Sequence, residues 1–305
     1  MALAIDRLTE SDIPAASRVV RRAFGTFLGA PDPDNFWPDR DMIGGRVRAP
    51  HVAGFAAKQD GTLVGSNFAT RWGSVGFFGP LSVEPSLQNA GIAQALLGPT
   101  IAQFDDWGLT HTGLFTFPHS PKHLALYRKY GFYPRYLTPI MSLAPIDRGT
   151  AGWHRFGALP PDRRAEALAG CREVTETLYP GLDLRGEIET VAGLRLGETV
   201  VLDGARGVEG FAICHFGPDT EAGADTCFVK FGAVRGGAPG FERLIDACQS
   251  LAVSVSSGSL VAGCNMARRR AFETMADRGF RTAFLGVHMQ KNNDRSEEHT
   301  SELQS

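Results

Sequence analysis

The sequence predicts an α/β protein of the α+β kind, with two similar domains in which helices flank a mixed, mostly antiparallel sheet. Strand and helix patterns alternate along the 305 residues, as expected where helices cover a sheet. One pattern also occurs twice, because Tyr130-Gly131-Phe132 corresponds to Arg278-Gly279-Phe280. The first triplet follows an apolar strand that ends at Val83, and the second follows one that ends at Val234. The number of residues between strand end and triplet is similar in the two cases. We therefore expect two copies of one strand-helix-strand-helix-strand unit.

In the N-terminal half, alternating apolar residues predict strands, and caps with 3.6-residue periodicity predict helices. Ser11 is the expected cap of the first helix, and Asp60-Gly61 marks a hairpin turn. Pro99 lies inside the longest helix, where it removes a hydrogen bond and should cause a kink. The expected strands are 2–8, 51–57, 63–71, 76–83, 113–117 and 136–143, the expected helices are 11–24, 91–107 and 122–130, and 29–41 is a loop.

The C-terminal half repeats this order more loosely. Its expected helices are 163–178, 241–252 and 268–277, and its expected strands are 199–202, 210–215, 227–234, 259–264 and 284–290. The predicted domains are 1–145 and 153–291, joined by a linker at 146–152. The tail 295–305 reads RSEEHTSELQS, lacks apolar periodicity and resembles a translated sequencing adapter. We interpret it as an artefact, with a disordered polar tail as the alternative.

Composition limits the possible classes of function. With 31 Lys+Arg against 33 Asp+Glu, no basic excess is available to neutralise phosphates, which argues against a nucleic-acid partner. No apolar run reaches the ~18 residues of a membrane-spanning helix, and residues 1–8 show no signal-peptide pattern. We expect a cytoplasmic protein without a membrane partner, a monomer or a homodimer.

Cysteine and histidine spacing predicts neither disulfides nor a metal site. The 5 cysteines are all in the second half, their number is odd, and none forms a C-x-x-C pair. We interpret them as buried free thiols. His119 and His123 are four residues apart, but Pro121 lies between them and no third ligand is near. We therefore expect no metal.

A possible phosphate-binding turn follows the strand that ends at Val83. A polar stretch, Glu84 to Ala90, leads into small residues at Gly91 and Ala93 that open a helix. Small residues allow a ligand to approach the backbone, and the free N–H groups of a first helical turn attract anions. The pattern is neither a dinucleotide-binding G-x-G-x-x-G nor a Walker loop. Without further context, a tight strand-to-helix turn explains it equally well.

Three motifs together resemble the GNAT superfamily of acyl-CoA N-acyltransferases. The coenzyme A loop of that family, Gln/Arg-x-x-Gly-x-Gly/Ala, is matched by Gln88, Gly91 and Ala93, after a strand with the pattern Leu81-x-Val83-x-Pro85. Leu126-Tyr127 and Gly131-Phe132 match the motif at the end of the family's later helix. The resemblance covers residues 1 to about 145 well. It implies a GNAT-like sheet with a splayed central strand pair, and acetyl-CoA as co-substrate.

The resemblance also implies the residues of the site. Acetyl-CoA is expected to contact Leu81, Val83, Gln88, Asn89, Ala90, Gly91, Ile92, Ala93 and Ser120. Tyr127 is the expected general acid, since a phenol of pKa ~10 can protonate a thiolate whose thiol has a pKa of ~8.5. Packing of Tyr127 in the core is the alternative, and Tyr130 is expected to be a packing residue.

The general base is left open. Glu84 is a weak candidate because it lies beside the reacting strand, although a solvated charge explains it better. The other candidates are Asp32, Asp34, Asp39, Asp41 and His119. An aromatic set could line the acceptor pocket or pack in the core: Phe24, Phe27, Phe36 and Trp37.

The second copy departs from the motifs. Its loop position reads Arg235-Gly-Gly-Ala238-Pro239-Gly240, and Met275 stands where the Tyr belongs. We therefore expect a tandem GNAT protein whose second copy has lost coenzyme binding. The expected activity is N-acetyl transfer from acetyl-CoA to a primary amine of a small molecule or peptide. The alternatives are a non-catalytic acyl-CoA sensor and a tandem acyltransferase like mycothiol synthase.

Overall fold

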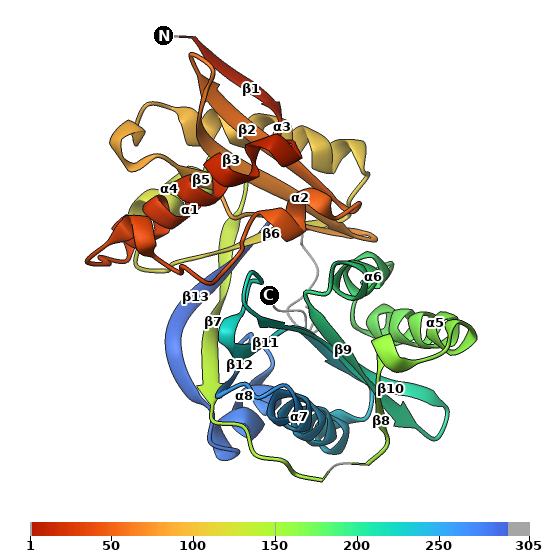
Figure 1. The fold of residues 1–305 in the computed structure, drawn as a ribbon. Helices are drawn as coiled ribbons and strands as arrows, with labels where there is room; N and C mark the ends of the chain where they lie inside the picture. The colour runs from red at the N-terminus through yellow and green to blue at the C-terminus, as the bar shows by residue number, and fades with distance from the viewer. Residues whose placement is uncertain (1, 150, 292–305) are drawn as a thin grey trace.

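A computed structural model describes residues 2–149 and 151–291 of the chain, and Figure 1 shows two halves joined through a shared sheet. The predicted tail 295–305 lies outside the described residues. Over the described residues a 13-stranded sheet runs in the order β1-β2-β3-β4-β6-β13-β7-β12-β11-β10-β9-β8, with β5 paired to β3. The α/β fold class and the mostly antiparallel sheet flanked by helices are therefore confirmed.

The N-terminal half contains both long helices and short strands. Its helices are α1 (Ile13–Phe27), α2 (Gly44–Arg48), α3 (Ile92–Asp106) and α4 (Pro121–Arg128). Its strands are β1 (Leu3–Arg7), β2 (Val52–Gln59), β3 (Thr62–Trp72), β4 (Val75–Phe78), β5 (Ser82–Val83), β6 (His111–Thr116) and β7 (Tyr133–Leu143). The expected loop 29–41 holds only one short 3-10 turn, Pro33–Asn35.

Two local expectations need correction. Thr9, rather than Ser11, caps the first helical segment, because Thr9 and Asp12 form a reciprocal capping box around a 3-10 turn that precedes α1. The strand expected at 76–83 is interrupted at Gly79-Pro80 and becomes β4 and β5. α3 continues through Pro99, and the following residue Thr100 donates its hydroxyl to the carbonyl of Leu96 at 2.8 Å.

The C-terminal half has a similar content. Its helices are α5 (Pro161–Leu178), α6 (Arg185–Leu194), α7 (Gly237–Ser254) and α8 (Arg269–Asp277). Its strands are β8 (Trp153–Arg155), β9 (Gly197–Gly204), β10 (Gly207–Gly217), β11 (Gly223–Val234), β12 (Ser259–Gly263) and β13 (Arg281–Lys291). Of these elements, β8 and α6 were not expected from the sequence.

Helices cover both faces of the sheet in each half. Successive residues of β3 point to opposite faces: Phe68 packs in a cluster with α1, while Ala69 packs in one with α3. In the second half, Phe211 of β10 packs in a cluster with α5, and Ala212 packs in one with α7. The two halves therefore have the same layered arrangement, with a hydrophobic cluster on each side of the sheet.

The two halves exchange their last strands. β13, from the end of the chain, lies antiparallel between β6 and β7 of the N-terminal half. β7 in turn pairs antiparallel with β12 of the C-terminal half. Figure 1 shows β7 and β13 running side by side through the junction. A cut at the expected linker 146–152 would therefore remove a strand from the interior of the N-terminal sheet.

Candidate active site

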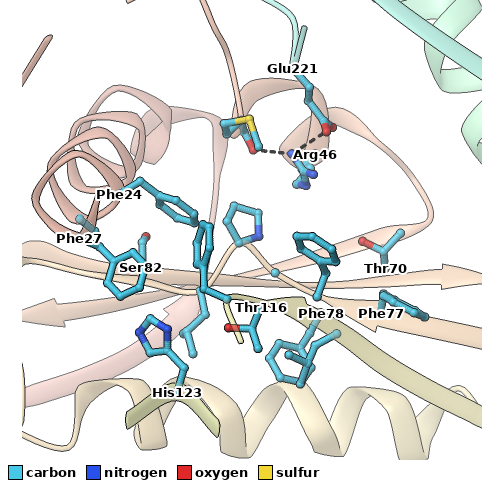
Figure 2. Close-up of a pocket in the computed structure, with 18 of the residues that line it drawn as sticks. Phe24, Phe27, Arg46, Thr70, Phe77, Phe78, Ser82, Thr116, His123 and Glu221 are labelled. Atoms are coloured by element: carbon cyan, nitrogen blue, oxygen red, sulfur yellow. Dashed lines mark hydrogen bonds and ion pairs between the residues drawn. The ribbon is translucent and has the colours of Figure 1, made fainter. Parts of the chain in front are cut away.

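A cavity opens where two central strands separate. β4 and β6 pair in parallel from Val75 with His111 to Phe78 with Leu114. Beyond that point the chain after β4 turns away to pair as β5 with β3, while β6 continues to Thr116. A cavity of about 820 Å³ begins at this opening and extends to residues of the C-terminal half. Figure 2 shows side chains from both halves around it.

The turn before α3 has the geometry expected of an anion-binding loop. Asn89 and Gly91 have φ of 69° and 79°, and the first turn of α3 has no side-chain cap. A Cβ placed on Gly91 would meet no atom within 4 Å, so the space beside this turn is open. Its N–H groups can therefore donate hydrogen bonds to an anionic group from outside the protein.

The structure brings the expected coenzyme residues to one wall. Apart from Ala90, every residue of the predicted set lies on the wall of the cavity. Ala90 is exposed and lies off the wall. Ser120 has a second role, because its Oγ caps α4 by accepting a hydrogen bond from the N–H of His123 at 3.4 Å. The expected residues are thus clustered around one opening, with the single exception of Ala90.

Lys122 is a wall residue that the sequence analysis missed. Its Nζ donates a hydrogen bond to Oε1 of Gln88 at 3.1 Å, so a positive charge lies beside the loop that opens α3. Both residues are exposed and line the cavity. The signal in the sequence was that Lys122 directly follows Pro121, the first residue of α4. Neither the coenzyme A loop motif nor the helix-end motif of the GNAT family specifies a residue at this position.

Tyr127 lies on the cavity wall at the end of α4. Its side chain is 7% exposed and packs edge-on against Phe78, with ring centroids 5.5 Å apart. Burial raises the pKa of Tyr127, and a hydrogen bond with Thr116 only partly offsets this. Tyr130 is not on the wall, and its hydroxyl donates to the carbonyl of Gln94 at 3.1 Å. Only Tyr127 of the two therefore faces the space where a ligand could bind.

The structure does not place the candidate bases in the cavity. Glu84, which directly follows β5, binds Arg22 of α1 in an ion pair of 3.1 Å and does not line the cavity. Asp34 shares the same Arg22 at 3.2 Å. Asp41 caps α2 by accepting hydrogen bonds from two N–H groups, both at 2.8 Å.

The remaining candidates are also away from the wall. Asp39 accepts a hydrogen bond from the N–H of Ala224 at 2.7 Å, and Asp32 is exposed. His119 stacks on Phe27 with a centroid distance of 5.6 Å. None of the three lines the cavity. Of the three, Asp39 contacts the second half through Ala224.

The aromatic set is divided between the cavity and packing. Phe24, Phe27 and Trp37 line the cavity. Phe36 does not, and its ring packs on Trp37 at 4.3 Å between centroids. Figure 2 shows Phe24 and Phe27 on the same side as His123 of α4, which also lines the cavity.

A cluster of charges forms the far end of the cavity. Nζ of Lys230 lies 2.5 Å from Glu187 and 2.9 Å from Glu221. Arg46 pairs with Glu221 at 3.0 Å, and His51 contacts Glu187 at 2.9 Å. Burial raises the pKa of Glu221, but Arg46 and Lys230 outweigh it and lower that pKa to about 2. Burial also raises the pKa of Glu187, but Lys230 and His51 outweigh it and hold that pKa well below the usual range.

This cluster was not expected from the sequence because its five members come from five separate segments. Glu187 lies on α6, a helix absent from the prediction although Leu184, Ile188 and Val191 have helical spacing. If α6 had been predicted, Glu187 would have been recognised as a charged residue beside the apolar face of that helix. No local pattern links it to Arg46 or Lys230.

The structure also describes the cysteines. The five cysteines are free and buried. Across residues 2–149 and 151–291, no three His, Cys, Asp or Glu side chains are grouped so that they could hold a metal ion. In the same part of the chain, no helix is both long and apolar enough to cross a membrane.

Comparisons with known proteins agree with this geometry. Residues 18–132 match the model of the Acetyltransferase (GNAT) family, so this part of the N-terminal half is similar to GNAT acetyltransferases. No curated protein matches the sequence.

Solved structures extend the likeness to both halves. A candidate acetyltransferase from Pyrococcus horikoshii has a TM-score of 0.72 and 14% identity, over 99% of this chain and 94% of that chain. A GCN5-related N-acetyltransferase from Sphaerobacter thermophilus has a TM-score of 0.60 and 14% identity, over 95% of each chain. At such identities the likeness establishes the fold alone.

Proposed function

We propose that the protein is an N-acetyltransferase that uses acetyl-CoA and transfers the acetyl group to a primary amine of a small molecule or peptide. The observation that carries the proposal is that Tyr127 and the uncapped turn before α3 lie on the wall of one cavity. A phosphate-binding turn and a buried proton donor are the two parts that acyl transfer from a thioester needs.

The residues around the turn fit the co-substrate. Its pyrophosphate would be held by N–H groups of the first turn of α3, from Gly91 to Ala93, and by the positive charge of Lys122. The open space at Gly91 leaves room for it. Leu81 and Val83 line the wall where the strands separate and would contact the pantetheine end. When bound, acetyl-CoA supplies an activated acetyl thioester.

Tyr127 is the proposed general acid. A proton donor has to be protonated before the reaction, and the raised pKa of the buried phenol keeps it so at neutral pH. Its hydrogen bond with Thr116 fixes the orientation of the hydroxyl group. Proton transfer from Tyr127 would neutralise the sulfur as it leaves.

His123 replaces Glu84 as the proposed proton acceptor. Its ring lies on the cavity wall, 6.4 Å from that of Tyr127. Burial, Lys122 and His119 lower the pKa of His123, so it is neutral at pH 7 and can accept a proton, directly or through water. The variant His123→Gln should lower kcat at pH 7, and the defect should shrink at high pH, where the amine loses its proton unaided. An unchanged kcat at pH 7 would remove His123 from the mechanism.

The second copy is proposed to lack a coenzyme site. A Cβ on Gly236 or Gly240, at the start of α7, would collide with or crowd Oε1 of Glu209, so the chain's own carboxylate occupies the position next to this helix start. Arg243 pairs with the same carboxylate. Met275 is packed in a hydrophobic cluster with α7. These contacts support a tandem arrangement in which the N-terminal half alone binds acetyl-CoA.

A thiol-release assay tests the function. Purified protein is mixed with acetyl-CoA and a panel of primary amines, and free thiol is measured together with the acetylated amine. The proposal expects thiol release that depends on both the protein and one class of amine. Tight binding of acetyl-CoA without release for any amine would instead identify a sensor.

A further inference from the structure

The far end of the cavity has the composition of a binding site for a second substrate. We define the polar floor as Arg46, Glu187, Thr190, His215, Glu221 and Lys230, all of which line the cavity. Four of its six side chains lie on elements of the C-terminal half, and Glu221 lies on the loop between β10 and β11 of that half. Figure 2 shows Arg46 and Glu221 across the cavity from Thr116 and Phe78.

We infer that the polar floor is the acceptor site and that it binds a primary amine whose other polar groups are neutral hydroxyls, as in an amino sugar. This inference rests on the proposed acetyl transfer. It also gives the second copy a role in substrate binding, in place of the lost coenzyme site.

Unpaired hydrogen-bonding groups on the floor point to a ligand. Both ring nitrogens of His215 and the hydroxyl of Thr190 are buried without a hydrogen-bond partner. The two residues are 1% and 8% exposed. A buried polar group without a partner destabilises the folded protein, and most such groups in folded proteins are paired. Since both residues lie on the cavity wall, a bound molecule can supply the missing partners.

The charges of the floor favour a ligand portion that is neutral. The carboxylates of Glu187 and Glu221 are balanced by Lys230 and Arg46, and each cation already contacts a carboxylate. A second ammonium or a carboxylate on the ligand would therefore be buried without a counter-charge, which is costly. Burial and, to a smaller extent, the nearby charge of Lys230 lower the pKa of His215 to about 4. This ring is therefore neutral and offers one hydrogen-bond donor and one acceptor.

The apolar walls of the cavity suit a compact ring. Aromatic side chains of both halves line the cavity, among them Phe24, Trp37 and Phe228. Ligand sites combine such apolar walls with a few polar groups that fix orientation. A polyhydroxylated ring could pack its C–H faces on these aromatics, place hydroxyls at Thr190 and His215, and extend its amine towards Tyr127.

A panel of four amines tests the substrate class. Glucosamine carries neutral hydroxyls, cyclohexylamine has a similar ring without them, spermidine adds cations, and β-alanine adds a carboxylate. With saturating acetyl-CoA, kcat/KM for glucosamine should exceed that of each of the others by at least tenfold. A higher value for spermidine or β-alanine would overturn the inference while leaving the acetyltransferase proposal intact.

A matched pair of variants tests the floor itself. Thr190→Val and Thr199→Val make the same change at buried threonines whose hydroxyls both lack partners, but only Thr190 lines the cavity. Thr190→Val should raise the calorimetric Kd for glucosamine about three- to tenfold, the value of one hydrogen bond, with the Kd for acetyl-CoA unchanged. Thr199→Val should change neither constant.

The two proposals can fail separately. If no amine is acetylated, the proposed function is wrong, and glucosamine binding to the protein decides the inference alone. Binding that Thr190→Val weakens and Thr199→Val does not would uphold the acceptor site. Absence of glucosamine binding, or equal effects of the two variants, would show that the polar floor serves only to join the two halves.

Discussion

Val287 of β13 is the register partner of Thr116 of β6, and Thr116 is hydrogen-bonded to Tyr127. The last strand of the chain therefore supports the strand that orients the proposed general acid. Met289 of the same strand is fully buried in the cluster that contains Tyr127. β13, whose Val287 lies 171 residues after Thr116 in the sequence, is thus part of the N-terminal core.

A fragment of residues 1–145 should consequently fail to fold. It would lack β13, leave facing edges of β6 and β7 without their partner, and expose the apolar surface that Val287 and Met289 cover. Unpaired edges and exposed apolar surface promote aggregation. Circular dichroism and thermal unfolding would show no cooperative transition for this fragment, whereas residues 1–291 should unfold cooperatively. A stable, monomeric fragment 1–145 that binds acetyl-CoA would contradict the role given to β13.

The strand exchange also explains what the sequence could and could not predict. Local signals located the loop at Gly91 and the helix that carries Tyr127, because caps, glycines and periodicity are encoded within a few residues. The pairing of β13 with β6 depends on contacts between distant segments, for which a single sequence has no local signal. The same is true of the contact between Lys230 and Glu187, which only the folded arrangement creates.

Glu84 illustrates a second limit. Its position after the reacting strand was read correctly, but the direction of its carboxylate depends on Arg22 of α1. The presence of that partner decides between a base and an ion pair. Sequence distance to a motif therefore identified the neighbourhood of the site but not which side chains face into it.

Gly91→Glu should abolish binding of acetyl-CoA. The new carboxylate would extend into the open space beside the first turn of α3 and repel the pyrophosphate there. Calorimetry should find one site per chain in the natural protein and none in the variant. Gly108→Glu is the matched control, because Gly108 also has a positive φ, 62°, and open space around it, yet it does not line the cavity. Two sites per chain, or equal losses in both variants, would refute the assignment.

Acid should destabilise the protein from about pH 6.5 downwards. Burial lowers the pKa of His111 and His215 to about 4 and, with His111 nearby, that of His288 to about 3. Because the unfolded chain binds protons near pH 6.5 and the folded chain does not, stability is full above that pH and is lost as the pH falls towards 4. Between pH 7.5 and 5.5, each of these histidines should lower the free energy of unfolding by about 1 kcal/mol.

Urea unfolding at several pH values measures this effect. His111→Gln should reduce the loss between pH 7.5 and 5.5 by about 1 kcal/mol, whatever its effect on stability at pH 7.5. A free energy of unfolding that stays constant from pH 7.5 to 5.5 would mean that the three rings are not buried in their neutral form.

Tyr127→Phe should slow acetyl transfer while leaving the affinity for acetyl-CoA nearly intact. The change removes the hydroxyl that protonates the leaving sulfur but keeps the ring that packs against Phe78. General acid catalysis of this kind is worth ~10²–10⁴ in rate, so kcat should fall by about that factor. Steady-state kinetics gives kcat, and calorimetry gives the Kd for acetyl-CoA.

Two further variants separate catalysis from packing. Tyr130→Phe removes a hydroxyl that bonds to the carbonyl of Gln94 outside the cavity, so it should cost stability but little rate. Met275→Leu, at the corresponding place in the second copy, should leave kcat unchanged, because that side chain has no proton to donate. If Tyr127→Phe kept full turnover and Tyr130→Phe lost it, the motif would be misaligned by one helical turn. If both retained it, the leaving sulfur would take its proton from water, and Tyr127 would serve only to pack the wall beside the splayed strands.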